Sequence, residues 1–114
     1  VQIAKEYADD EDAFSKKIYD VIGAGVGIIE SVPAAVSIAY YTQDPNKCCL
    51  MCANLGGDTD TIGAMATAIC GAFVGYSKIN PEYTELLRVQ NPETDFEEYI
   101  NILEKGRELL GCGR

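Results

Sequence analysis

Apolar residues recur at intervals of three and four along most of the chain, which is the spacing of one face of an α-helix. Capping residues, glycines and prolines divide these runs into successive elements. The pattern predicts helices over residues 14–22, 31–41, 45–53, 60–76, 81–87 and 96–110. No segment alternates apolar and polar residues as a half-buried strand does. The fold class that we predict is therefore all-α.

Several of these helices have explicit start signals. In three of them a capping side chain precedes a proline, whose missing N–H costs nothing within the first turn. These starts are Ser31-Val32-Pro33, Asp44-Pro45 and Asn80-Pro81. We expect Asp58 or Thr59 to cap the helix that follows a glycine pair, and Asp95 to cap the last helix.

Length and charge restrict the classes of function. The 114 residues amount to one domain or part of one, with an acidic lead-in over residues 1–12 and a short tail over 111–114. With 9 basic and 18 acidic residues, the net charge of −9 disfavours a nucleic-acid or anionic-membrane partner. The sequence has no histidine, which excludes catalysis by a His-containing triad or dyad.

Five cysteines occur in the chain, at positions Cys48, Cys49, Cys52, Cys70 and Cys112. An odd, crowded set is a poor disulfide framework, so we expect a reducing, cytoplasmic compartment. No segment has the length and composition of a membrane span. The Cys49-x-x-Cys52 spacing can chelate zinc, but no second ligand pair accompanies it, and we favour buried small hydrophobes.

A glycine-rich segment over residues 23–27 resembles the turn of a dinucleotide-binding motif. However, Ile28 occupies the position of the third glycine, and no strand–helix–strand unit surrounds the segment. We interpret it as a loop between helices that allows close backbone approach. It is called the glycine loop below.

Two carboxylates lie close together in the segment Gly56-Gly57-Asp58-Thr59-Asp60-Thr61. One carboxylate at a helix start is an ordinary cap, whereas two with a following hydroxyl also suit a hard cation such as Mg²⁺, Mn²⁺ or Ca²⁺. The spacing alone does not distinguish a metal site from a cap with a solvated aspartate. The next helix carries Gly63, Thr67, Gly71 and Gly75 every four residues, which predicts a central helix that neighbours approach closely.

The segment from Leu55 to Ile62, with the small-residue helix after it, resembles the ADP-ribosylglycohydrolase family, which includes the dinitrogenase-reductase-activating glycohydrolase and the J1 crystallins. A second block, Glu30-Ser31-Val32-Pro33-Ala34-Ala35 after the glycine loop, also matches. The resemblance covers about residues 13–110. It implies a compact, orthogonal all-α bundle that hydrolyses the N- or O-glycosidic bond joining ADP-ribose to a protein or a small conjugate.

The resemblance also implies roles for individual residues. Asp58, Asp60 and Thr61 would be ligands of a two-Mg²⁺ centre, with Mn²⁺ as a possible substitute, and the two aspartates would be catalytic. The loop residues Gly25, Val26 and Gly27 would border the substrate. Supporting positions would be Glu30, Ser31, Gly56 and Gly57.

The family domain is considerably longer than this chain, and its amino-terminal part supplies further acidic ligands. The resemblance therefore implies that the chain is the C-terminal portion of the domain and holds about half of the metal site. We expect it to be inactive without the N-terminal segment. The alternative is a non-catalytic member that binds ADP-ribose or is structural, as the crystallin relatives are.

Overall fold

A computed structural model of the chain describes residues 1–111, and all regular structure within them is helical. The elements are α1 (Gln2–Glu6), α2 (Glu11–Lys17), η1 (Ile18–Ile22), α3 (Ile28–Thr42), α4 (Pro45–Leu55), α5 (Thr59–Val74), η2 (Tyr76–Lys78), α6 (Pro81–Gln90) and α7 (Phe96–Leu109). The prediction of an all-α fold is confirmed. The chain divides after Asn80 into two units, each described by itself below.

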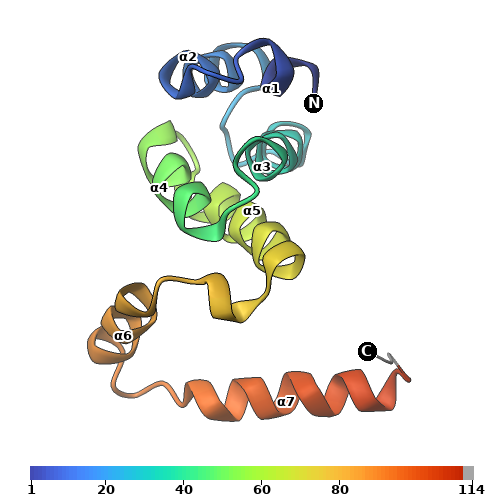
Figure 1. Cartoon of the computed structure of the whole chain (residues 1–114), viewed down its shortest axis with the longest axis vertical. Helices are drawn as coiled ribbons and strands as arrows, with labels where there is room; N and C mark the ends of the chain where they lie inside the picture. Colours follow the sequence, from blue (N-terminus) through green and yellow to red (C-terminus); the bar gives the residue numbers. More distant parts are fainter. Residues whose placement is uncertain (112–114) are drawn as a thin grey trace. The chain divides into compact units, whose positions relative to one another are not determined.

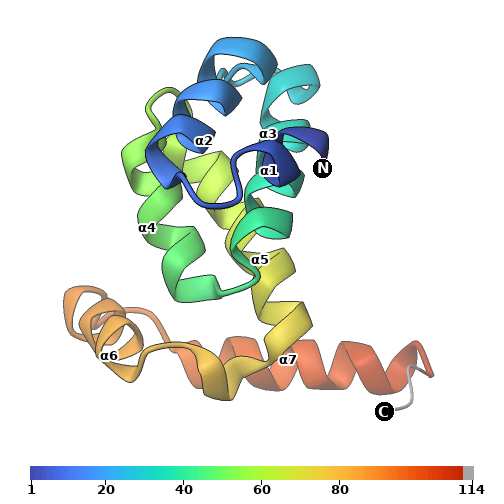
Figure 2. The same ribbon diagram turned by 45° about the horizontal axis from the view of Figure 1, so that its top comes forward.

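The first unit, residues 1–80, is built around three helices that pack against one another, α3, α4 and α5 (Figures 1 and 2). The short helix α1 packs on α3, and α2 contacts α4. Phe14, Ile18, Ile38 and Ile62 are completely buried between these helices. Burial of these side chains holds the unit together, at about 1.5–3 kcal/mol for each large apolar side chain.

Local signals set most helix ends. The Asp44 carboxylate accepts a hydrogen bond from the Asn46 N–H at 2.9 Å, and α4 begins at the next residue, Pro45. Asp95 accepts one from the Glu98 N–H at 3.0 Å and caps α7 in the same way. Both predicted starts are confirmed because a cap depends only on residues within one turn.

The predicted start of α3 is wrong. The helix begins at Ile28 and has Gly27 as its N-cap, so that Pro33 lies inside it rather than in its first turn. The carbonyl of Gly27 accepts hydrogen bonds from the N–H groups of both Glu30 and Ser31, at 2.9 Å each. The helix therefore starts where the glycine loop ends, and Pro33 omits one later bond of a helix already formed.

The cysteines of α4 and α5 behave as small apolar residues. Cys48, Cys52 and Cys70 are buried, which confirms that prediction, whereas Cys49 is exposed and does not fit it. A side-chain hydrogen bond with Cys52, together with burial, raises the pKa of the Cys48 thiol. Burial also raises the pKa of Cys70. Cys112 lies outside the described residues.

The second unit contains α6 and α7. Arg88 forms an ion pair with Glu97 at 3.0 Å between Nη2 and Oε1. Neither helix has a buried residue, although α7 carries the apolar spacing that predicted a core-facing helix. Leu103 and Leu109 are 72% and 80% exposed. Within residues 1–111, no helix is long and apolar enough to cross a bilayer.

Candidate metal and substrate site

The two aspartates predicted as metal ligands lie at the amino terminus of α5. Gly56 and Gly57, with φ of +87° and +72°, reverse the chain between α4 and α5. Both angles lie in the left-handed region, which glycine adopts without steric cost. Asp58 takes the N-cap position, but its side chain makes no capping hydrogen bond. The turn therefore brings Asp58, Asp60 and Thr61 together at the start of α5, with the Asp58 side chain not engaged in capping the helix.

The two carboxyl groups interact with each other. A side-chain hydrogen bond with Asp58 lowers the pKa of Asp60, and the backbone N–H groups of Thr61 and Asp60 lower it further. Asp58 is half-buried, whereas Asp60 and Thr61 are exposed. Adjacent carboxylates repel each other unless a proton or a cation lies between them, and the positive end of the helix dipole offsets part of that repulsion.

The glycine loop packs directly against this turn, although residues 28–55 lie between the two in sequence. The Asp58 N–H donates a hydrogen bond of 2.7 Å to the carbonyl oxygen of Ala24. A Cβ atom added to Gly57 would lie 2.2 Å from that same oxygen. Glycine at position 57 is therefore required both by the backbone angle and by the approach of the loop.

Glu30 holds the glycine loop in this position. Its Oε2 accepts a hydrogen bond from the Gly25 N–H at 2.7 Å. Cβ atoms on Gly23 and Gly25 would each come within 2.5 Å of the Glu30 carboxylate group. The two glycines thus leave the space that this carboxylate fills. Glu30 fixes the loop from within, and through Ala24 it fixes the backbone at Asp58.

The other predicted positions have different surroundings. Ser31 is buried on α3, consistent with a supporting place behind the loop. Val26 is 85% exposed and Gly27 is exposed, so both border solvent. The Gly25 N–H already donates to Glu30, so any substrate contact by Gly25 must use another atom.

Sequence reasoning missed Ala24 and Tyr19. Ala24 contributes a carbonyl, which no side-chain pattern reveals. The Tyr19 ring lies 3.3 Å from where a Gly56 Cβ would be, and it lines a cavity of about 320 Å³ with the glycine loop, Glu30 and Gly57. Its position on the helical repeat gave no signal for this contact, because the contact depends on how η1 packs beside the turn.

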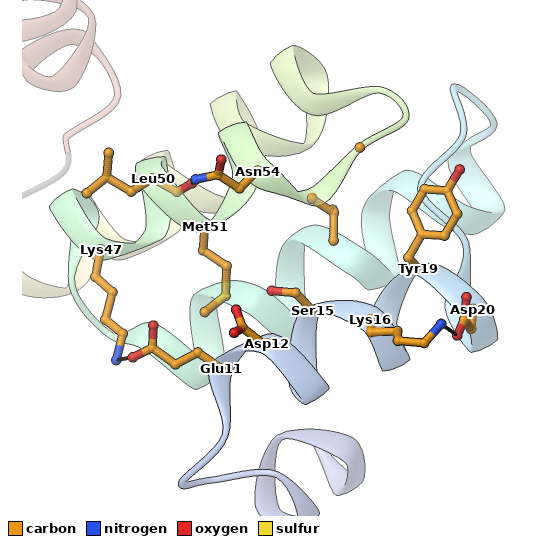
Figure 3. Close-up of a pocket in the computed structure, with 12 residues that line it drawn as sticks. Glu11, Asp12, Ser15, Lys16, Tyr19, Asp20, Lys47, Leu50, Met51 and Asn54 are labelled. Atoms are coloured by element: carbon orange, nitrogen blue, oxygen red, sulfur yellow. Dashed lines mark hydrogen bonds and ion pairs between the residues drawn. The ribbon is translucent and has the colours of Figure 1, made fainter.

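A larger groove has α2 and η1 on one side and α4 on the other (Figure 3). Its volume is about 730 Å³. Lys16 pairs with Asp20 at 2.8 Å between Nζ and Oδ2, and Lys47 pairs with Glu11. The pairing with Glu11 raises the pKa of Lys47. Gly56 reaches one end of this groove, but neither predicted aspartate ligand lines it. The aspartate turn, residues 56–61, therefore meets this groove only through Gly56.

The turn suits a hard cation in part. Carboxylate and hydroxyl oxygens are the donors that Mg²⁺ prefers. Among residues 1–111, however, no three His, Cys, Asp or Glu side chains lie close enough together to hold a metal ion. Asp58, Asp60 and Thr61 could thus contribute some ligands of a site whose remaining ligands come from elsewhere.

Comparison with known proteins extends this picture. The sequence model of the ADP-ribosylglycohydrolase family matches residues 1–110. The chain is 50% identical over 102 residues to the Escherichia coli (strain K12) protein named "Uncharacterized protein YegU", which covers 89% of this chain and 30% of that protein.

Two other relatives have names that state an activity. The chain is 27% identical over 92 residues to ADP-ribosylhydrolase ARH3 of Gallus gallus, covering 71% of this chain and 25% of that protein. It is 30% identical over 96 residues to ADP-ribosylarginine hydrolase Tri1 of Serratia proteamaculans (strain 568), covering 73% and 26%. The chain spans less than a third of the length of these relatives. No solved structure matches it.

Proposed function

Because this chain belongs to the ADP-ribosylglycohydrolase family, we propose that it forms the C-terminal portion of a Mg²⁺-dependent hydrolase domain. The reaction is cleavage of the N- or O-glycosidic bond between ADP-ribose and an acceptor, either a protein side chain or a small molecule. The relatives named ADP-ribosylhydrolase and ADP-ribosylarginine hydrolase support this class of reaction.

The observation that carries the proposal is the contact between the glycine loop and the aspartate turn. The hydrogen bond from the Asp58 N–H to the Ala24 carbonyl places the glycine loop beside the aspartate turn. Substrate-binding and metal-binding elements must lie next to each other if a metal is to act on a bound sugar.

Asp58, Asp60 and Thr61 would hold part of a Mg²⁺ pair, or of an Mn²⁺ pair in its place. Divalent cations of this kind supply Lewis-acid chemistry: they orient hydroxyl groups and lower the pKa of bound water.

The chain's own residues prepare the site. Gly57 allows the turn to approach the loop, and Glu30 keeps the loop rigid through the Gly25 N–H. The exposed Val26 and Gly27 then present the loop's outer edge to the ADP-ribose. Such a rigid support reduces the reorganisation that binding would otherwise require.

The isolated chain should not hydrolyse ADP-ribose conjugates. Two carboxylates and one hydroxyl supply few protein ligands for two Mg²⁺ ions, so we expect the isolated chain to hold such ions weakly. A member that binds ADP-ribose without cleaving it remains the second candidate, because the part of the chain that the structure describes holds no complete metal site.

The proposal is tested by exchange into a relative. We would replace the matching segment of the Serratia hydrolase with this chain and measure release of ADP-ribose from an ADP-ribosylated arginine peptide, with Mg²⁺ and with EDTA. The chimaera should release ADP-ribose only with Mg²⁺, and Asp60→Asn should abolish release while the helical circular dichroism stays unchanged.

The matched control is Asp12→Asn, an exposed aspartate that lines the groove between α2 and α4. It removes the same charge and should leave turnover unaltered. A folded chimaera that binds ADP-ribose but never cleaves it from the arginine peptide would favour the non-catalytic candidate. Equal turnover in Asp60→Asn and the unsubstituted chimaera would refute the role assigned to Asp60.

A further inference from the structure

The helix α5 is covered on only part of its circumference. Ile62, Ala66 and Cys70 face α3 and α4 and are buried, and a Cβ on Gly63 would lie 3.3 Å from the Cys52 Cβ of α4. On the other side, Ala64, Ala68 and Ala72 are exposed, four residues apart. A Cβ on Gly71 would have no neighbour within 4 Å. The predicted central helix therefore has close neighbours on one side only.

An apolar groove adjoins this open side. It has a volume of about 380 Å³ and lies between α3 and α5, lined by Val36, Ala39, Tyr40, Gln43, Ile69, Cys70 and Phe73. We refer to it as the α3–α5 groove. Large apolar side chains at its edges are exposed, Ile69 to 45% and Phe73 to 72%. Exposed large apolar side chains gathered around an apolar groove are typical of an interaction site.

The groove has no charged residue in its lining. The chain as a whole carries a net charge of −9, which opposes close association of two copies of the chain. The surface therefore favours a partner that is apolar where it touches, and disfavours a second copy.

The comparisons indicate what such a partner is. The match to the Escherichia coli relative takes in 30% of that protein, so about 70% of its length has no counterpart in this chain. An all-α domain of that size buries its helices on more than one side. Small residues on the open face of α5 allow the axis of another helix to approach closely.

We propose that the α3–α5 groove, with the adjoining open face of α5, is the docking surface for a helix from the part of the family domain that this chain does not span. That helix contacts the groove with apolar side chains and lies over the alanines of α5. This open face begins at Asp60, so the docked helix also runs beside the aspartate turn. The inference follows from family membership and exposed surface, and it does not depend on hydrolysis.

The test uses the unmatched part of the Escherichia coli relative, co-expressed with this chain and carrying an affinity tag. The two polypeptides should purify together on the affinity tag. Light scattering should give the mass of a 1:1 complex. Ile69→Asp or Val36→Asp in this chain should raise the dissociation constant at least tenfold. A tenfold rise corresponds to a loss of about 1.4 kcal/mol in the free energy of binding.

The matched control is Leu50→Asp, which places the same charge at an exposed leucine of α4 outside the groove, where 53% of the residue is exposed. It should leave the dissociation constant unchanged. Circular dichroism and the midpoint of thermal unfolding of each variant alone show whether it is folded.

Three results would overturn the proposal. They are failure of the two polypeptides to associate, loss of association with Leu50→Asp but not with the groove variants, and a dimer of this chain that Ile69→Asp converts to a monomer. The last result would assign the groove to a second copy. Because no result depends on turnover, an inactive but associated complex would contradict only the proposed function.

Discussion

Replacing Gly57 by alanine tests the contact between the glycine loop and the aspartate turn. The new Cβ would lie 2.2 Å from the Ala24 carbonyl oxygen, so the loop must move away. That movement breaks the 2.7 Å hydrogen bond from the Asp58 N–H. The substitution also forces alanine to adopt the positive φ of 72°. Both effects destabilise the folded chain.

The expected magnitude follows from these two contributions. A non-glycine residue held in the left-handed region costs about 1–3 kcal/mol. Loss of one backbone hydrogen bond costs about 0.5–1.5 kcal/mol. Together they predict that Gly57→Ala lowers the free energy of unfolding by about 1.5–4.5 kcal/mol. Urea denaturation followed by circular dichroism measures this difference directly.

Gly71→Ala is the matched control, because it makes the same chemical change on α5 where a Cβ meets nothing within 4 Å. Alanine is favoured over glycine within a helix by about 0.5–1 kcal/mol, so this variant should be more stable than the unsubstituted chain. Opposite signs for the two variants would support the described contact. A Gly57→Ala variant within 0.5 kcal/mol of the unsubstituted chain would refute it, about 0.5 kcal/mol being the size of an ordinary surface effect.

The remaining predictions concern a partly buried hydrogen-bond acceptor, the thiols and a helix cap. Glu30→Ala removes the acceptor of the loop N–H and should destabilise the chain by about 1–3 kcal/mol, whereas Glu30→Gln, which keeps an acceptor oxygen, should lose less; equal losses in urea unfolding would contradict the hydrogen bond. Native iodoacetamide treatment with peptide mass spectrometry should modify the exposed Cys49 well before the buried Cys70, whose pKa is raised by burial; similar rates would show that the α3–α5 packing opens readily. Asp10→Ala removes the cap of α2 and should lower stability by about 0.5–2 kcal/mol, while Asp9→Ala, one residue outside the cap, should change thermal unfolding little; the reverse order would contradict the cap.

The elements of this fold could be predicted because their signals are local. Asp44 and Asp95 cap helices through hydrogen bonds that span two or three residues, and such bonds form in the same way in any surroundings. The alternation of buried and exposed cysteines on α4 follows equally from the helical repeat. The segment from Gly56 to Thr61 likewise indicates a turn with two carboxylates from residue type alone.

The relation between the glycine loop and the aspartate turn depended on packing between helices. Position 57 must be glycine because Ala24, distant in sequence, approaches it, and Glu30 folds back onto its own loop only because the glycines leave room. The start of α3 was predicted wrongly because contacts with Asp58 and Glu30 hold the glycine loop, and the helix begins where that loop ends at Gly27. Helix caps and helix faces depend on interactions between residues one or two turns apart, so the sequence alone predicts them. Contacts between residues far apart in the sequence depend on how the helices pack when they bury their apolar faces. That packing is defined only in the assembled tertiary structure.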